Sequence, residues 1–354
     1  MLHELMIAAT VVAAIAGATA LLLLAGGFSV REGLAALWSG SFGSWYALTS
    51  ATLVRAVPLM LTGVAVALAF RAGVFNIGAE GQLLVGAATA AAVALALGAD
   101  RGGAVPGLGL GLALLAATAG GAMWASIAAL LRTRFGVLEV ISTIMLNFVA
   151  IHLVSYLVRG PLQEPTRVYP QSATLAAAFH LPLLPGAGRL HAGLLLALVT
   201  AGATGWALRN TAAGFRLMAT GESPSAAASA GGIDVRGTTV RAFLVTGALA
   251  GLAGGVEVAG VTFALYENIS PGYGYTAIAV ALLARLDPWR VIATAILFAA
   301  LEAGAGAMQR DASVPSTLVS VIEAALILAV VSAQAIQSRR LSSSGATDVR
   351  SARA

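Results

Sequence analysis

Long apolar segments, separated by shorter polar ones, make up most of the chain. Apolar and polar residues do not alternate within them, as they would in the strands of a membrane β-barrel. All but one of these segments approach the roughly 20 residues that an α-helix needs to cross a bilayer. We expect ten such helices, at residues 6–27, 46–70, 78–98, 106–131, 137–158, 191–208, 240–263, 274–286, 289–308 and 315–336. The pattern therefore predicts an all-α polytopic membrane protein with about ten transmembrane helices, of which 274–286 is short for a full crossing.

The composition agrees with a membrane protein and excludes several kinds of chemistry. Of the 354 residues, 59% are hydrophobic and only 10% are charged, against roughly 25% charged residues in soluble domains. The chain has no cysteine, which excludes disulfides, thiolate catalysis and cysteine-bound metal. All 20 basic residues are arginine, so a Walker A loop, which needs a lysine, is excluded as well. We expect no catalytic residue and no metal site, and any ATP that drives the protein must bind to another chain.

The distribution of arginine predicts how the chain crosses the membrane. If the N-terminus is cytoplasmic, 13 arginines fall in cytoplasmic segments and 6 in outer segments, as the positive-inside rule requires. Both termini are then cytoplasmic, residues 159–190 form an outer loop, and residues 209–239 form a cytoplasmic loop. We expect the polar tail 337–354 to be disordered. The net charge of +5 follows from this topology, so it predicts contact with the lipid bilayer and no nucleic-acid partner.

Polar side chains gather on one face of segment 137–158. Glu139, Ser142, Thr143 and Asn147 follow one another at steps of three and four residues, which places them in one stripe on a helix. Such a stripe faces protein or water and not lipid. Two interpretations of Ser142, Thr143 and Asn147 stay open: they line a translocation path, or they join helices by hydrogen bonds. For Glu139, near the inner interface, we favour the structural interpretation.

A second polar group lies between segments 46–70 and 78–98. Asn76, Glu80 and Gln82 occur close together among small residues that let backbones approach closely. This pattern favours a helix break buried in the protein, because non-helical backbone is tolerated at membrane depth only where it is buried or lines a cavity. The alternative is a tight cytoplasmic turn with Asn76 as an N-cap.

The cytoplasmic loop 209–239 contains a run of small residues that predicts a short helix. Ser223 is a suitable N-cap, and Pro224 fits the first helical position. A compact helix on the cytoplasmic face is a surface on which another protein can dock, although an ordinary connecting loop would show the same pattern. In segment 240–263, Gly247, Gly251 and Gly255 recur at steps of four and predict a face for close helix packing.

Four sequence blocks occur in a characteristic order: 69–82 (AFRAGVFNIGAEGQ), 139–147 (EVISTIMLN), 214–233 and 277–288. Together they resemble the permease subunits of bacterial ABC importers in the nucleoside and simple-sugar group, within the superfamily that includes ribose and branched-chain amino acid permeases. The resemblance implies a ten-helix permease domain over residues 1–336, similar to the cobalamin-importer type. It would form the translocation path for a nucleoside or a simple sugar and would have no catalytic activity of its own.

The resemblance also implies roles for particular residues. Phe75 and Asn147 are expected to line the path, since an aromatic ring can stack on a nucleobase and an amide can bond to its edge. The full set expected along the path is Phe75, Asn76, Glu80, Gln82, Ser142, Thr143 and Asn147. The loop expected to dock on the ATPase contains Arg216, Gly221, Glu222, Ser223, Pro224, Ala226, Ala227, Gly232 and Ile233. Within this path, Asn76, Glu80 and Gln82 would fix the helix break.

The partners that the resemblance implies are an ABC ATPase subunit, a second permease subunit (the same or paralogous) and an extracytoplasmic substrate-binding lipoprotein. ATP and Mg would bind to the ATPase, so no cofactor is expected on this chain. The expected location is the bacterial inner (plasma) membrane. Two alternatives from other classes are a membrane-embedded enzyme and a proton-coupled secondary transporter or channel for a small polar solute, in which Glu80 or Glu302 would carry the proton.

Overall fold

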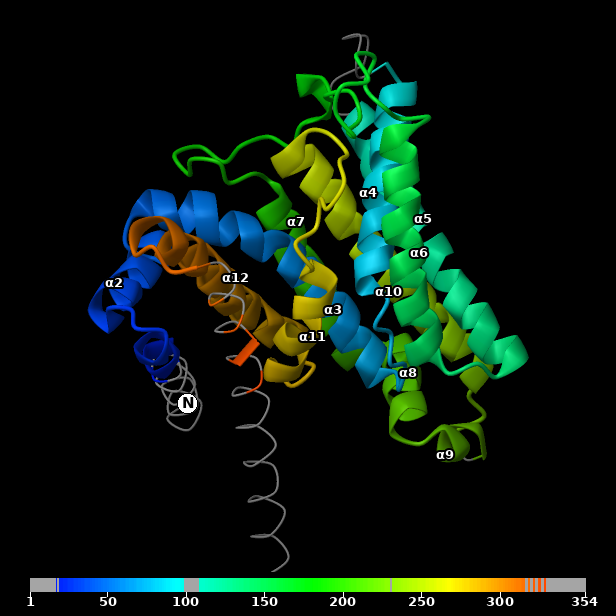
Figure 1. Cartoon of the computed structure of the whole chain (residues 1–354). Helices are drawn as coiled ribbons and strands as arrows, with labels where there is room; N and C mark the ends of the chain where they lie inside the picture. The colour runs from blue at the N-terminus through cyan, green and yellow to red at the C-terminus, as the bar shows by residue number, and fades with distance from the viewer. Residues whose placement is uncertain are drawn as a thin grey trace, which may run out of the picture. The chain divides into compact units, whose positions relative to one another are not determined.

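A computed structural model of the chain describes residues 19–98, 108–229 and 231–315, with isolated positions at 17, 318, 321, 324, 325 and 328. This part of the chain is helical apart from its loops and two isolated β-bridges (Figure 1). In chain order the helices are α2 (Val30–Ser41), η1 (Ala47–Thr52), α3 (Leu53–Arg71), α4 (Ala79–Ala96), α5 (Leu108–Phe135), α6 (Glu139–Arg159), η2 (Ala177–Phe179), α7 (Gly193–Asn210), α8 (Ala212–Glu222), α9 (Pro224–Ser229), α10 (Val235–Glu257), η3 (Val258–Thr262), α11 (Tyr273–Leu283) and α12 (Pro288–Asp311). The labels η1 and η3 denote π-helices, and η2 denotes a 3₁₀-helix.

The chain divides into two compact units. The larger unit comprises residues 53–299, and the smaller unit combines the residues up to 52 with those from 300 onward. Within the smaller unit, α2 packs against the C-terminal part of α12 at glycines. A β-carbon at Gly40 would lie 2.3 Å from that of Ala307, and one at Gly304 would lie 2.6 Å from the carbonyl oxygen of Leu37. The described residues of the predicted path and docking loop all lie in the larger unit.

The prediction of about ten transmembrane helices is wrong for the part of the chain that the structure describes. There, six helices are long and apolar enough to cross a membrane: Ala47–Arg71, Ala79–Ala96, Leu108–Phe135, Glu139–Arg159, Val235–Thr262 and Pro288–Asp311. Segment 191–208 forms α7, but glycine and threonine dilute its apolar residues, and the helix ends on Arg209 and Asn210. Segment 274–286 forms α11, whose 11 residues extend about 16 Å, half of a bilayer core.

The remaining two predicted crossings fall at least half outside the described residues. These are segments 6–27 and 315–336, and the tail 337–354 lies wholly outside as well. The expected likeness to the cobalamin-importer type depended on the ten crossings and is not supported by this structure. The error arose because apolar composition alone cannot distinguish a helix that crosses the membrane from a shorter one that is buried in protein.

Helix α10 forms the centre of the larger unit and packs against α3, α4 and α5. Its glycines make this packing possible. A β-carbon at Gly247 would lie 2.5 Å from the carbonyl oxygen of Gly121, and one at Gly251 would lie 2.3 Å from that of Ala117. Only glycine allows two helix backbones to approach so closely. The close-packing face predicted from Gly247, Gly251 and Gly255 is therefore confirmed.

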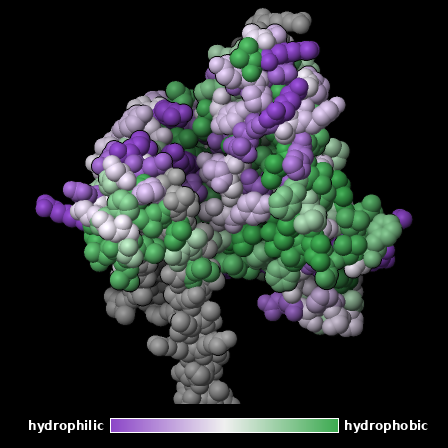
Figure 2. All heavy atoms as spheres, viewed as in Figure 1, coloured by the Kyte–Doolittle hydropathy of each residue, from purple (hydrophilic) through white to green (hydrophobic). Residues whose placement is uncertain are grey.

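Helices α5 and α6 each bury only one side. In α6 the buried residues are Ser142, Thr143, Asn147, Ala150, Val154 and Val158, so the predicted polar stripe faces the protein. The other side of α6 carries exposed apolar residues such as Met145, Phe148 and Tyr156. Figure 2 shows hydrophobic residues gathered over this side of the larger unit, between more hydrophilic regions above and below. This distribution is typical of a surface that faces lipid or another membrane subunit.

Candidate functional site

The chain between α3 and α4 is not helical, and it runs inside the larger unit. Residues 72–78 form a turn followed by an extended segment, which appears in Figure 1 as the thin blue ribbon beside α10. Gly73 begins this segment with a left-handed φ of 68°, a conformation that favours glycine. The amide of Gly81 bonds to Asn147, near the middle of α6. Helix α4 therefore begins deep in the bundle and not at its end, as expected for a helix break buried in protein.

The side chains of Asn76 and Gln82 hold the two ends of this break together. The Asn76 Nδ2 donates to Gln82 Oε1 at 3.1 Å, and the Gln82 Nε2 donates back to Asn76 Oδ1 at 3.0 Å. Asn76 also accepts from the amide of Gly78 at 2.9 Å and donates to Thr246 Oγ1 of α10 at 3.2 Å. Both amides are buried, so these bonds satisfy groups that would otherwise be costly to bury.

Helix α6 holds the same break from the other side through its polar stripe. Asn147 Oδ1 accepts from the amide of Gly81 at 2.8 Å, while its Nδ2 donates to the carbonyl of Ile77 at 2.9 Å and to the Tyr275 hydroxyl at 3.2 Å. Thr143 Oγ1 accepts from the amide of Ile77 at 3.2 Å. Asn147 is fully buried, and both of its N–H groups are occupied. In this conformation the side-chain amide of Asn147 fixes the backbone at Ile77 and Gly81.

Glu80 joins the N-terminus of α4 to the N-terminus of α11. Its Oε2 accepts a 2.7 Å hydrogen bond from the amide of Gly274, and the Ser270 side chain is a further hydrogen-bond partner. A β-carbon at Gly274 would lie 2.2 Å from the Glu80 nitrogen, so the two helix ends are in backbone contact. Each helix N-terminus carries a partial positive charge of about half a unit. The Glu80 side chain therefore supplies a hydrogen-bond acceptor where the two helix N-termini meet.

A cavity of about 310 Å³ lies beside this junction, with Glu80 on its wall. The opposite walls come from the second half of α6 and from the loop between η3 and α11. Its lining residues are Glu80, Leu84, Ile151, His152, Val154, Ser155, Arg159, Glu267, Asn268 and Ser270. Hydroxyl, amide, carboxylate and guanidinium groups thus surround a space of the size of a small-molecule site.

An ion pair closes one side of the cavity. The Arg159 Nε and Nη2 donate to the two carboxylate oxygens of Glu267 at 2.7 and 3.0 Å, and Ser155 Oγ also donates to Glu267. Arg159 and then Ser155 lower the pKa of Glu267 to about 2. Glu267 is therefore charged at neutral pH, and the bidentate geometry fixes the guanidinium.

Sequence reasoning found Glu80 but missed the other polar residues of the cavity wall. One signal was available, because Asn147, Ile151, Ser155 and Arg159 continue the stripe of α6 at steps of four. The contribution of Glu267 and Ser270 had no such signal, since the loop 263–272 reaches the cavity only through tertiary folding. Among the described residues, no group of three His, Asp or Glu side chains comes together as a metal site.

None of the other residues predicted for the path lines this cavity. Phe75 is exposed, and its ring lies 5.3 Å from that of Phe70 in a tilted arrangement. Ser142 is buried and donates to the carbonyl of Glu139 at 3.1 Å. Glu139 itself forms a 2.9 Å ion pair with Arg132, the structural role favoured for it above. Asn76, Gln82, Thr143 and Asn147 brace the break next to the cavity.

The predicted docking loop folds into α8 and α9. The amide of Ala226 donates to Ser223 Oγ at 3.4 Å, and Pro224 begins α9, as predicted for the short helix. Gly232 has a left-handed φ of 58° and precedes Ile233, whose amide bonds to the carbonyl of Ala227. The two helices enclose a groove of about 350 Å³ lined by Phe215, Ala219, Glu222, Ser223, Ala226, Ala227, Gly231 and Ile233. Arg216 is exposed and lies outside this groove.

Gly221 connects α8 to the turn that precedes the helix break. A β-carbon at Gly221 would lie 2.1 Å from the carbonyl oxygen of Arg71 and 2.8 Å from the Gly73 nitrogen. The Arg71 Nε in turn donates to the carbonyl of Leu286, just after α11, at 2.8 Å. The same turn therefore contacts α8, the chain leading to Glu80, and the end of α11.

Apolar helices packed around a buried polar junction and a solute-sized cavity are typical of a membrane transport protein. A family model described as "Branched-chain amino acid transport system / permease component" matches residues 48–331. The chain belongs to this family. It is the permease subunit of an ATP-binding-cassette transporter, a multi-pass membrane protein that works with an ATPase subunit.

Several curated relatives share most of their length with this chain. The guanosine ABC transporter permease protein NupP of Bacillus subtilis is 39% identical over 90% of this chain and 91% of its own. The glucose ABC transporter permease protein TsgB13 of Haloferax volcanii is 40% identical over 82% and 77%. The nucleoside ABC transporter permease protein NupB of Lactococcus lactis is 30% identical over 87% and 85%. No solved structure matches the chain.

Proposed function

We propose that this permease imports a nucleoside or a simple sugar and that the solute passes through the cavity beside Glu80. The observation that carries this proposal is the polar wall of that cavity at the junction of two helix ends. The relatives are named for guanosine, nucleosides and glucose, and these solutes share a sugar ring with several hydroxyl groups. Carboxylate, serine and asparagine groups such as Glu80, Ser270 and Asn268 can accept from and donate to such hydroxyls.

The ATPase docks, in this proposal, on α8 and α9. The apolar groove between them can receive a side chain of the partner, and Gly221 passes a movement of α8 to the Arg71 turn by direct backbone contact. That turn leads to Asn76 and Glu80 on one side and to α11 on the other. ATP and Mg bind to the ATPase, and their binding and hydrolysis shift the permease between outward-open and inward-open states through different contacts at α8.

The orientation that we propose places α8 and α9 in the cytoplasm of the bacterial cell, with both termini on that side of the inner (plasma) membrane. Arginines at this end of the larger unit support it: Arg132 approaches the Gly73 carbonyl, Arg236 bonds to Thr133, and Arg209 pairs with Asp287. At the other end, an extracytoplasmic lipoprotein would deliver the solute. A second permease subunit, the same or paralogous, would complete the path.

Transport in proteoliposomes tests this function. The chain is reconstituted with its ATPase, second permease and lipoprotein, and uptake of labelled guanosine and glucose is measured with and without ATP. We expect guanosine or glucose to be taken up, and this uptake should require ATP. Uptake by the chain alone, driven by a pH gradient, would overturn the proposal and favour a secondary transporter.

A pair of variants tests the cavity. Ser155→Trp fills it and should abolish uptake while the ATPase still co-purifies. Tyr156→Trp, on the exposed side of the same helix, is the control and should transport normally. Normal uptake by Ser155→Trp would remove the cavity from the path.

A further inference from the structure

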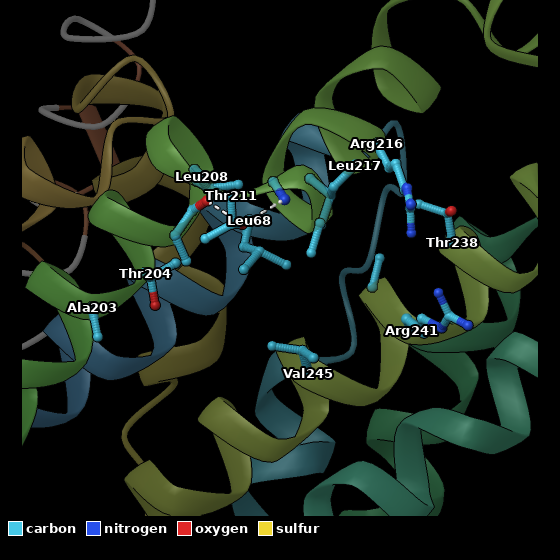
Figure 3. Close-up of a pocket in the computed structure, with 14 residues that line it drawn as sticks. Leu68, Ala203, Thr204, Leu208, Thr211, Arg216, Leu217, Thr238, Arg241 and Val245 are labelled. Atoms are coloured by element: carbon cyan, nitrogen blue, oxygen red, sulfur yellow. Dashed lines mark hydrogen bonds between the residues drawn. The ribbon is translucent and has the colours of Figure 1, made fainter. Parts of the chain in front are cut away.

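A second cavity, of about 500 Å³, lies at the opposite end of the larger unit from Arg159 and Glu267. It opens between α3, α7, α8 and α10, and Figure 3 shows its lining. Most of its wall is apolar and comes from Leu68, Ala207, Leu208, Leu217, Ala242 and Val245. From Thr238 to Val245 it follows α10 for about 10 Å, so it extends from the end of the bundle toward the middle of the membrane.

Two arginines lie on one side of this cavity. Arg216 of α8 and Arg241 of α10 reach it together with Thr238 (Figure 3). Within the described ranges, neither guanidinium forms a hydrogen bond or an ion pair with another residue. Like charges on the wall of one cavity repel each other, and an anion bound in the cavity would reduce the repulsion and accept hydrogen bonds from both arginines.

The combination of an apolar cavity and a basic rim identifies the kind of anion. A soluble phosphate or an acidic side chain would be bound by the arginines alone and would leave the apolar part of the cavity without an occupant. Basic pockets between transmembrane helices on the cytoplasmic side bind the headgroups of anionic lipids. In the orientation proposed above, the basic rim lies at the level of the headgroups of the inner leaflet, and the apolar part lies at the level of the acyl chains.

We propose that this cavity binds an anionic phospholipid of the cytoplasmic leaflet, with its phosphate at Arg216 and Arg241 and an acyl chain along α10. This inference rests on the proposed orientation of the permease but not on its solute. Arg216 then acts on the lipid, although the sequence placed it with the docking loop. Because the lipid would contact α8 as well as α7 and α10, it would stabilise the position of the helix on which the ATPase docks.

Native mass spectrometry of the full-length chain in detergent tests the site. The protein is titrated with phosphatidylglycerol or phosphatidylcholine, and the fraction of protein that retains lipid is counted. We expect the wild type to retain phosphatidylglycerol several times more strongly than phosphatidylcholine. Arg216→Gln and Arg241→Gln should each weaken this retention about fivefold, the contribution of one basic residue near a charged membrane surface.

Two further variants distinguish this site from general attraction to charge. Arg134→Gln removes an exposed arginine of the same end outside the cavity and should leave retention unchanged. Val245→Trp fills the apolar part and should weaken the retention of phosphatidylglycerol with both arginines present. Each variant is first checked for the elution profile and melting temperature of the wild type.

Several results would overturn the inference. They include equal retention of the two lipids by the wild type, an equal loss in Arg134→Gln and Arg241→Gln, and full retention by Val245→Trp. If inorganic phosphate displaced the phosphatidylglycerol completely, the site would be one for a free anion. If retention disappeared when a second permease subunit was bound, the cavity would belong to the subunit interface. Lipid retention is measured without transport, so this test can fail while the proposed solute transport is confirmed, and the reverse.

Discussion

The amide of Gly274 donates a 2.7 Å hydrogen bond to the carboxylate of Glu80, across 194 residues of sequence. This bond joins the first turns of α4 and α11, two helices of the larger unit. The contact is close because Gly274 has no side chain, and a β-carbon there would lie 2.2 Å from the Glu80 nitrogen. The junction therefore needs a hydrogen-bond acceptor on one helix and a glycine on the other.

Removing the carboxylate should destabilise the protein. Glu80→Ala leaves the buried Gly274 amide without an acceptor, which costs about 1–3 kcal/mol, whereas Glu80→Gln keeps an acceptor oxygen and should cost less. The melting temperature of the purified chain, followed by circular dichroism, measures both. Glu32→Ala, an exposed carboxylate in the first turn of α2, is the control. A melting temperature of Glu80→Ala equal to that of the wild type would contradict this account.

A methyl group at Gly221 should uncouple the ATPase from transport. In Gly221→Ala the new β-carbon would lie 2.1 Å from the Arg71 carbonyl, so α8 must move away from the turn, at a cost of about 1–3 kcal/mol. We expect ATP hydrolysis to continue while solute uptake falls. Gly111→Ala is the matched control, since nothing lies within 4 Å of a β-carbon there. Equal uptake by both variants would show that the contact transmits nothing.

The groove between α8 and α9 should be needed to hold the ATPase. Ala226→Trp fills the groove and should reduce co-purification of the ATPase at least about tenfold, which corresponds to 1.4 kcal/mol. Ala228→Trp places the same ring on the same helix outside the groove lining and should leave co-purification unchanged. If both variants retained the ATPase, another surface would carry the docking.

The exposed ring of Phe75 gives a test of the solute class. If it stacks on a nucleobase, Phe75→Leu should raise the KM for guanosine roughly tenfold, within the range of one base–aromatic contact. Glucose has no base, so its uptake, where present, should be unaffected. An unchanged KM for guanosine would assign Phe75 to packing against Phe70 alone.

The ion pair of Glu267 should make stability depend on pH in acid. Its pKa is lowered from 4.5 to about 2 in the folded protein, first by Arg159 and then by Ser155. The pair therefore stabilises fully above about pH 4.5, and this contribution is lost as the pH falls toward about 2. The melting temperature of the wild type should exceed that of Glu267→Gln at neutral pH, and the difference should shrink below pH 4.5. A constant difference would exclude this linkage.

Much of the polar junction could be predicted from sequence, but its bonding could not. Asn76, Glu80 and Gln82 were recognisable because polar residues between apolar segments are costly unless they are buried with partners. The stripe of α6 was recognisable from its spacing. Asn147 forms hydrogen bonds with the helix break, and Glu80 accepts one from α11. Both contacts join segments that are distant in the sequence, so the sequence could not predict them. The same limit contributed to the wrong number of crossings, because α11 has the composition of a spanning helix and the length of half of one.

The sequence by itself determined that the chain enters a membrane as helices and has no lysine to form a nucleotide site, since these depend on local composition and transfer energies. It also determined the short helix after Ser223 and the glycine face of α10, because caps and small residues act at close range. Only the tertiary structure decided which residues surround the two cavities. It also decided which groups form hydrogen bonds with each buried side-chain amide. Those choices depend on how segments far apart in the sequence pack, and local patterns do not carry that information.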